Sequence, residues 1–351
     1  MGSDMPRTLK PFERDLLNLI QKQVPLAQRP FAEIARQLGV AEDQVIDVLR
    51  DLKTGQQAVI RQISAIFDTK ALGYRSSLVA AKIAREKLDQ SAAIINTHPG
   101  VSHNYQRNHE YNLWYTIAIP PDSKLGLEGT VDILHRESGA MRTRLMPTLR
   151  LFKIGVMLNL GEHDIGARDT VPAFSEKDRE AAMAFHITDQ DQRMIRVLQQ
   201  DLPIEPRPFD RWAQEAQVDI NALLSAAAAY QDHKQMRRFS AVLHHREAGF
   251  MSNAMGVWVV PADRQEQFGE AAGKFSAVSH CYLRPTYEDW PYNVFTMVHA
   301  PSKEGCEQVL KTISDASGIR DYSALFSSKE YKKIRVQYFM PDVQRWEDAH
   351  A

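Results

Sequence analysis

The chain has 351 residues, of which 44% are hydrophobic and 25% charged, a composition that favours two or three globular domains over disorder. Its formal net charge of −1 argues against a generally basic nucleic-acid-binding protein, and two cysteines are too few for a disulfide framework or a cysteine-based structural metal site. The start MGSDMPRTLK lacks the apolar core of a signal peptide, and no apolar run approaches the roughly 20 residues of a membrane span, so we expect a soluble cytoplasmic protein.

The N-terminal residues 8–70 have the pattern of a small helical domain. Apolar residues recur at helical spacing in three successive segments, and Gly39 separates the second segment from the third. Two helices around a short turn that contains glycine are typical of a helix-turn-helix. The β-rich residues 58–67 follow, and we expect them to form the wing of a winged helix-turn-helix domain.

Residues 74–160 alternate between strand and helix signals. In chain order, the pattern predicts a strand at 76–83, a helix at 87–97, strands at 101–107 and 111–119, a helix at 125–135 and a last strand at 149–158. The order βαββαβ is that of a ferredoxin-like domain.

The second half of the chain repeats the first at an offset of roughly 177 residues, far longer than the period of a solenoid. Residues 61–66 match 237–242, and the sequence Val-Ser-His occurs at 101–103 and again at 278–280. We therefore predict an α+β protein made by tandem duplication, with a polar linker at 161–187, a second winged helix-turn-helix at 188–246 and a second ferredoxin-like domain at 249–342.

The motif Ser-His-x-Tyr-x-Arg occurs once in each half, at 102–107 and at 279–284. Alternate residues of a strand share one face of a sheet. The two expected faces hold His103, Tyr105 and Arg107 in the first half and His280, Tyr282 and Arg284 in the second. A proton donor, a phenol and a carboxylate-binding guanidinium on one face indicate a binding or catalytic surface.

A winged helix-turn-helix followed by a βαββαβ domain resembles the layout of the Lrp/AsnC regulators. The segment HPGVSHNYQRNHEYNLWYT at 98–116 more specifically resembles one subunit type of the sirohaem decarboxylases, and SHCYLRPTYEDWPYNVFTMVH at 279–299 resembles the other type. The resemblance covers almost all of the chain and implies a natural fusion of the two subunits.

This resemblance implies an activity. Sirohaem decarboxylases remove the carboxyl groups of two acetate side chains of sirohaem, at C12 and C18, and give 12,18-didecarboxysirohaem without an organic cofactor. They act in the alternative haem pathway and in the pathway to d-type haem, and the sequence does not choose between the two. The iron belongs to the substrate, and we assign no metal to protein ligands alone.

Loss of CO2 from an acetate on a pyrrole needs a proton donor, and histidine is the natural donor near neutral pH. His103 and His109 are the first-half candidates, one as donor and the other as axial ligand of the substrate iron, in either order. His280 is the candidate in the second half, which has no equivalent of His109 and carries a longer hairpin at 285–291. The two pockets are therefore expected to be unequal, and which half is active stays open.

The expected substrate-binding residues are Tyr105, Arg107, Trp114, Tyr282, Arg284, Tyr287, Trp290, Lys153 and Arg335. Arginine offers a bidentate fork to a carboxylate, and an aromatic ring can stack on a macrocycle. The structural alternatives are a cross-strand ion pair with Glu110 for Arg107 and a place in the sheet core for Trp114.

The segments that would contact DNA are either acidic or free of lysine and arginine. Residues 41–53 contain four acidic and two basic residues, and residues 218–233 contain no lysine or arginine. Such helices repel or ignore phosphates, so we expect scaffold and dimerisation modules without DNA binding. The alternatives for the whole chain are a regulator of the Lrp/AsnC type and a tetrapyrrole carrier without chemistry. The expected partners are sirohaem and, by resemblance, a second copy of the chain or related decarboxylase subunits.

Overall fold

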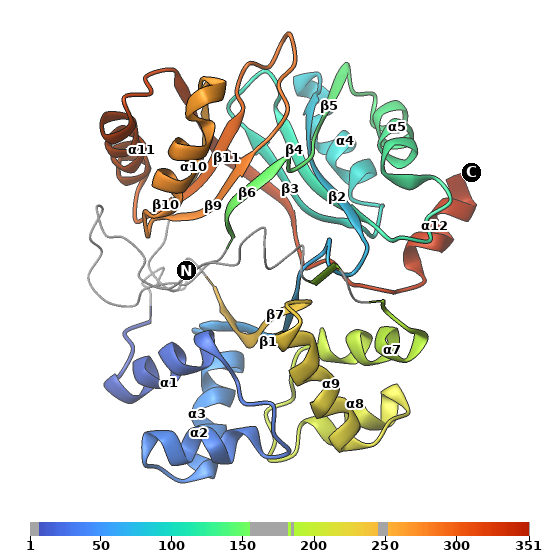
Figure 1. Cartoon of the computed structure of the whole chain (residues 1–351), viewed down its shortest axis with the longest axis vertical. Coiled ribbons are helices and arrows are strands. Elements are labelled where there is room, and N and C mark those ends of the chain that lie inside the picture. The colour runs from blue at the N-terminus through green and yellow to red at the C-terminus, as the bar shows by residue number, and fades with distance from the viewer. Residues whose placement is uncertain (1–6, 155–181, 184–185, 245–251, 351) are drawn as a thin grey trace. The chain divides into compact units, whose positions relative to one another are not determined.

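The computed structural model describes residues 7–154, 182–183, 186–244 and 252–350 (Figure 1). The chain divides into two compact units, one with the described residues of 1–72 and 178–251, the other chiefly with those of 73–156 and 252–351. The first unit thus combines the two helical regions, and the second combines the two strand-rich regions. Nearly all of the expected linker at 161–187 lies outside the described residues. No helix in the described part of the chain is long and apolar enough to cross a membrane.

The first unit contains two similar sets of three helices and one strand. They are α1 (Pro11–Lys22), α2 (Pro30–Leu38), α3 (Glu42–Thr54) and β1 (Ile60–Phe67), then α7 (Asp189–Leu198), α8 (Phe209–Ala216), α9 (Ile220–Asp232) and β7 (Met236–Leu243). Apolar residues at helical spacing are buried in each set, for example Leu16 and Ile20 in α1. Gly39 follows α2 with a φ of 69°, a left-handed conformation that favours glycine and ends the helix.

The strands of this unit form one shared ribbon. β1 and β7 pair antiparallel, with Ser64 opposite Ser240 (Figure 1). Each set supplies one strand after its third helix, so the backbone groups of that strand are satisfied by the strand of the other set. The structure therefore differs from the expectation of a separate wing in each helical region.

The second unit is built on a nine-stranded antiparallel sheet in the order β5-β2-β4-β3-β11-β8-β10-β9-β6. The first repeat supplies β2 (Arg75–Lys82), α4 (Leu88–Ile95), β3 (Val101–Arg107), β4 (Leu113–Ile119), α5 (Gly126–Ser138), β5 (Arg142–Met146) and β6 (Arg150–Ile154). The second repeat supplies β8 (Ser252–Trp258), α10 (Gln265–Gly273), β9 (Val278–Leu283), β10 (Val294–Ala300), α11 (Lys303–Ser317) and β11 (Tyr322–Lys333), and α12 (Asp342–His350) follows.

The two repeats exchange strands. The first part of β11 pairs with β8 of its own repeat, and the rest pairs with β3 of the first repeat. In return, β6 pairs with β9 of the second repeat. The expected last strand at 149–158 is therefore wrong as the fourth strand of its own repeat, because β5 fills that place beside β2. Pro147 has no amide hydrogen and separates β5 from β6, whereas β11 is continuous.

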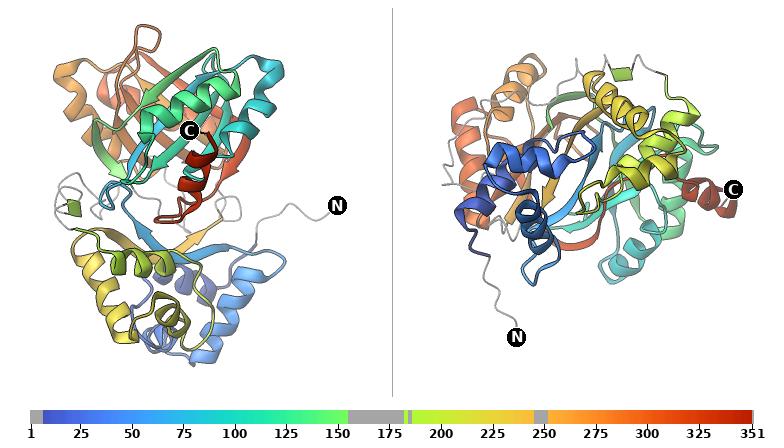
Figure 2. Two further views of the ribbon diagram at one scale, coloured as in Figure 1. Left: turned by 90° about the vertical axis from the view of Figure 1, so that its right-hand side faces the viewer. Right: turned by 90° about the horizontal axis from the view of Figure 1, so that it is seen from below.

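The sheet has a helix-covered face and an inner face. Helices α4, α5, α10 and α11 lie on the outside of the curled sheet (Figures 1 and 2), and apolar cores fill the space beneath them. Successive strand residues point to opposite faces, so the other residues of each strand form the inner face. The inner faces of the two repeats share one core, which includes Trp114, Met146, Met255, Trp290 and Leu325. This shared inner face positions the motif residues.

Candidate functional site

The predicted His-Tyr-Arg faces are both present on the inner face. In β3, the ring centroids of His103 and Tyr105 are 6.2 Å apart, and the Arg107 guanidinium carbon lies 5.8 Å from the Tyr105 ring centroid. Strand pairing places Tyr105 opposite Trp114, which belongs to the inner-face core. The alternation along the strand therefore predicted the shared face of the first repeat correctly.

The second repeat reproduces this geometry in β9. The ring centroids of His280 and Tyr282 are 6.0 Å apart, and the Arg284 guanidinium carbon lies 4.7 Å from the Tyr282 ring centroid. Tyr282 lies opposite Phe295 of the inner-face core, as Tyr105 lies opposite Trp114.

Arg107 and Arg284 are buried cations. Their exposed fractions are 5% and 8%. Nη1 of Arg107 donates a hydrogen bond to the Leu325 carbonyl at 2.7 Å, and Nη1 of Arg284 donates to the Met146 carbonyl. Each guanidinium thus contacts the fourth strand of the other repeat.

Neither guanidinium has a counter-ion among the described residues. No carboxylate of that part of the chain pairs with Arg107 or Arg284, and the proposed alternative Glu110 pairs with Lys82 at 2.7 Å. Burial lowers the pKa of each guanidinium to about 10, so both stay charged at neutral pH. A buried cation without an anion creates a positive potential that favours a carboxylate ligand.

A serine hydroxyl forms a hydrogen bond with the histidine ring of each motif. The strand pairing slips by one residue at Ser102 and at Ser279, which marks an irregularity of the β-bulge type in both repeats. A bulge re-aims side chains. Ser102 Oγ lies 3.0 Å from His103 Nδ1, and Ser279 Oγ lies 2.8 Å from His280 Nδ1. The repeated serine was the sequence signal for this contact, and the prediction gave it no role.

His109 lies half-buried at the junction of the repeats. Its Nδ1 accepts a hydrogen bond from the Tyr111 amide at 3.1 Å, and its ring meets Trp290 edge to face at 5.1 Å. Burial lowers the pKa of His109, which favours the neutral ring. Because Nδ1 is the acceptor, the proton of that neutral ring lies on Nε2.

The hairpin at 285–291 anchors the second repeat to the first. Asp289 accepts hydrogen bonds from the Tyr111 hydroxyl at 2.7 Å and from Arg144 at 3.1 Å, and it also pairs with Arg142. Hydrogen bonds from Arg144 and Tyr111 hold the pKa of Asp289 well below its usual range. Tyr287 donates to the Leu145 carbonyl, so the hairpin also ties to β5.

Asp289→Asn is expected to loosen this anchor. The asparagine keeps the shape of the side chain but removes the charge that holds two guanidinium groups, so the midpoint of thermal unfolding should fall by about 2–4 °C. Glu110→Gln is the matched control, because in the described part of the chain Glu110 pairs only with exposed Lys82, and such a pair contributes little. Equal midpoints for the two variants in a calorimetric scan would contradict the anchoring role.

Comparison with known proteins decides the family. A model described as "AsnC-like ligand binding domain" matches residues 71–153 and 247–332, and one described as "Siroheme decarboxylase NirDL-like HTH domain" matches 13–61 and 191–237. Over 332 residues, the chain is 36% identical to a siroheme decarboxylase of Hydrogenobacter thermophilus, covering 94% of this chain and 96% of the relative. The chain belongs to the sirohaem decarboxylase family.

Its architecture is that of the fused members of this family. The crystal structure of the siroheme decarboxylase NirDL in complex with an iron-uroporphyrin III analogue matches with a TM-score of 0.73 and 32% identity, covering 97% of this chain and 98% of that chain. A siroheme decarboxylase beta subunit of Methanosarcina barkeri is 42% identical over 147 residues, which are 97% of that subunit but 42% of this chain. This sirohaem decarboxylase homologue therefore contains two subunit-sized repeats in one chain.

Several expected substrate-binding residues of this family member are buried in the inner-face core or face away from it. Trp114 is 1% exposed and donates its indole N–H to the Tyr111 carbonyl, and Trp290 is fully buried against it at 5.1 Å. Both rings pack in the inner-face core, so neither offers a free face for stacking on a macrocycle. Lys153 donates to the Phe275 carbonyl and lies opposite Cys281, on the helix-covered face. Arg335 follows β11 and is half-buried.

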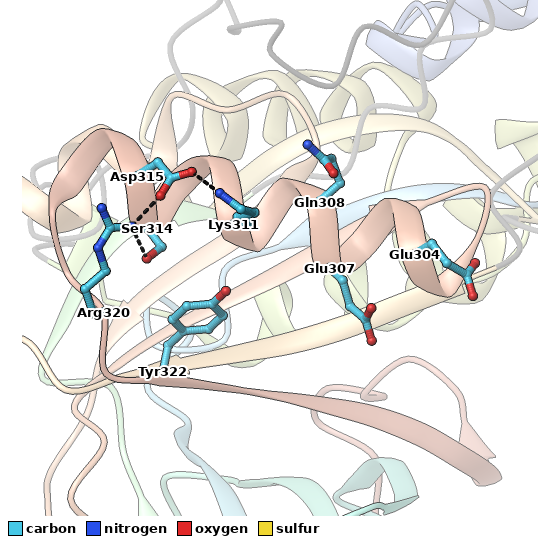
Figure 3. A pocket seen from close by; sticks show the side chains of 8 residues that line it. All are labelled: Glu304, Glu307, Gln308, Lys311, Ser314, Asp315, Arg320 and Tyr322. Carbon is cyan, nitrogen blue, oxygen red and sulfur yellow. Dashed lines mark hydrogen bonds and ion pairs between the residues drawn. The ribbon is translucent and has the colours of Figure 1, made fainter.

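A hollow of about 630 Å³ lies on α11, away from the motif residues of the decarboxylase repeats. Figure 3 shows its lining, in which Asp315 pairs with both Lys311 and Arg320. These charges satisfy one another at an exposed surface. The hollow therefore offers no unpaired group comparable to the buried arginines of the inner face.

Proposed function

We propose that this chain is a carboxy-lyase that removes the carboxyl groups of two acetate side chains of sirohaem, at C12 and C18, and yields 12,18-didecarboxysirohaem. Membership of the sirohaem decarboxylase family supports this activity. The observation that carries it is the pair of buried guanidinium groups, Arg107 and Arg284, which have no carboxylate partner in the described chain and lie beside the motif tyrosines.

The duplicated geometry supports one acetate for each repeat. Arg107 would bind a carboxylate in the first repeat and Arg284 in the second, with Tyr105 and Tyr282 as hydrogen-bond donors. Each guanidinium is held by a carbonyl of the opposite repeat, so its position depends on both halves of the chain. The fusion would therefore hold two similar carboxylate sites at a fixed spacing within one unit.

The chemistry requires proton transfer. A proton delivered to the ring carbon next to the one that carries the acetate creates an electron sink; the bond to the carboxyl carbon then breaks, CO2 leaves, and its electrons form an exocyclic double bond. Protonation of the exocyclic carbon and return of the ring proton complete the methyl group, so each acetate takes up one net proton. We assign donation to His103 in the first repeat and to His280 in the second. Tyr105 and Tyr282 keep the carboxylate beside these donors.

His109 supports a second donor in the first repeat. Its neutral tautomer carries the proton on Nε2, because Nδ1 accepts from the Tyr111 amide. A nitrogen that carries a proton cannot ligate iron, so this tautomer suits His109 for delivering the second proton, to the exocyclic carbon, beside His103. We assign no organic cofactor, because protonation by histidine supplies the electron sink and the iron arrives with the substrate.

The test is anaerobic incubation of the purified protein with sirohaem, followed by mass spectrometry of the extracted tetrapyrrole. Loss of two CO2 units is the expected result. Loss of one would restrict the chemistry to a single repeat. An unchanged mass with a shifted absorption spectrum would instead favour the tetrapyrrole carrier.

A regulator of DNA is the weaker alternative. α3 carries four acidic and two basic residues, and α9 carries no lysine or arginine. We therefore expect no mobility shift of double-stranded DNA at about 50 mM salt, where phosphate contacts are strongest. A shift of one DNA sequence that an excess of unrelated competitor DNA does not abolish would contradict this prediction, since non-specific phosphate contacts do not distinguish the two.

The proposal includes a homodimer of the fused chain and a cytoplasmic location, both taken from the family resemblance. Light scattering of the purified protein would test the dimer directly, since a monomer corresponds to 39.9 kDa.

A further inference from the structure

The second repeat contains a chain of three polar side chains that has no counterpart among the described residues of the first repeat. Ser279 Oγ lies 2.8 Å from His280 Nδ1 and 2.8 Å from His299 Nε2. Ser279 is 5% exposed, so the bridge is protected from exchange with solvent at its centre. In the first repeat, the Ser102 hydroxyl contacts one imidazole only among the described residues, that of His103.

The difference follows from one position in the third strand of each repeat. His103 lies opposite Thr116 in β4, and His280 lies opposite Met297 in β10. Two residues further along, β4 has Ala118 and β10 has His299. A methyl group therefore stands in the first repeat at the place where the second repeat has an imidazole.

A serine hydroxyl between two imidazoles can pass a proton. It has one hydrogen and two lone pairs, so it donates to one ring nitrogen while it accepts an N–H from the other. The Met297 carbonyl is a weaker competitor for the same hydrogen, at 3.3 Å. If the Ser279 hydroxyl donates to His280 Nδ1, the proton of neutral His280 lies on Nε2. The same hydroxyl oxygen then accepts a hydrogen bond from the Nε2–H of His299.

We propose that His299 is a positioning and proton-reloading residue that acts through Ser279 on His280, so that the second repeat replaces its catalytic proton internally and the first repeat does not. This inference rests on the proposed function. In one concerted step, His280 gives its Nε2 proton to the substrate, the Ser279 proton moves to His280 Nδ1, and the Nε2 proton of a protonated His299 moves to Ser279, so that the His280 proton then lies on Nδ1. The imidazolium of His299 becomes neutral, and His280 is neutral before and after the step.

The different exposure of Ser279 and His299 is consistent with this direction of proton transfer. Ser279 is buried, whereas His299 is only partly buried and can regain its proton from solvent. No imidazolate forms at any stage. The arrangement therefore predicts two acetate sites with unequal proton supply, although their histidine, tyrosine and arginine residues are alike.

The test uses His299→Gln in an anaerobic time course with sirohaem. Glutamine keeps a polar group near Ser279 but carries no transferable proton. One of the two CO2 losses should slow by at least about tenfold while the other keeps its rate, and KM should stay the same. Ser279→Ala should slow the same CO2 loss and spare the other. Ser279→Thr should restore the wild-type rate of the slowed loss, since threonine keeps the hydroxyl.

His135→Gln is the matched control. His135 Nδ1 lies 2.9 Å from the Thr143 hydroxyl, so the substitution alters a contact of the same kind outside the motif strands. Both CO2 losses should keep the wild-type rate in this variant. Wild-type rates in His299→Gln, or equal slowing of both losses together with a lower unfolding midpoint, would overturn the relay.

A second measurement does not depend on turnover. In protein labelled with ¹⁵N-histidine, Ser279→Ala should shift the ring signals of two histidines, those of His280 and His299, and leave that of His135 in place. Unchanged ring signals would also overturn the relay. A wild type that releases no CO2 would remove the proposed function itself, whereas an active wild type with an unaffected His299→Gln variant would remove this inference alone.

Discussion

The double variant His103→Gln, His280→Gln is expected to bind sirohaem but to release both CO2 units much more slowly than the wild type. Each histidine lies on the inner face beside a tyrosine, and a serine fixes one of its ring nitrogens. Glutamine keeps a polar side chain of similar length but has no proton to give near neutral pH. General acid catalysis typically contributes about 10²–10⁴-fold, so each affected step should slow by that factor.

The single variants make this prediction sharper. His103→Gln and His280→Gln should each accumulate a product that has lost one CO2, which mass spectrometry distinguishes from substrate and final product. His135→Gln serves as the control, since its ring contacts Thr143 and no motif residue. If one single variant lost both steps and the other lost neither, one repeat would carry out both reactions, and the equal division of the acetates would be wrong.

Arg107→Met is expected to weaken the binding of sirohaem by about 10–100-fold, because hydrogen bonds to charged groups contribute about 1.5–3 kcal/mol. The guanidinium is 5% exposed and has no carboxylate partner among the described residues, so its charge is available to a substrate anion. Methionine retains much of the side-chain volume without the charge. An absorbance titration would measure the dissociation constant, and Arg284→Met should give a similar result.

The Leu325 carbonyl loses its donor in Arg107→Met, so stability must be measured beside affinity. Arg107→Lys restores the charge without the bidentate fork and should recover part of the affinity. Arg142→Met is the control, because Asp289 already pairs with that arginine. Wild-type affinity in Arg107→Met with an unchanged unfolding midpoint would contradict the assignment of Arg107 as a carboxylate site.

The sequence predicted the local features of the second unit well, because strand alternation is local. Predicting that His103, Tyr105 and Arg107 share one face required only the two-residue period of a β-strand. Alternation also placed Trp114 on that face, yet the ring is buried, because Trp290 of the other repeat covers it. The depth of a side chain on a shared face depends on its partner, which the pattern of one strand does not contain.

Long-range pairing explains the remaining differences. Lys153 faces the helices because β6 joins β9 with Lys153 opposite Cys281, and a single-strand pattern does not specify that register. Asp289 gains its partners Arg142 and Tyr111 from the other repeat, and His299 meets Ser279 across two strands. Each of these contacts joins segments whose proximity is a property of the folded sheet.

The exchange of β6 and β11 has a consequence during synthesis. The outer edge of β3 is completed by the last part of β11, in which Ser327 lies opposite Arg107. At typical rates of about 5–20 residues per second, a ribosome needs roughly 10–45 s to make the intervening chain. During that time the nascent first repeat presents the unpaired edge of β3, the strand that carries His103, Tyr105 and Arg107. Such an edge can pair with strands of other chains. Solubility of the newborn chain should therefore depend on what shields β3 until translation is almost finished.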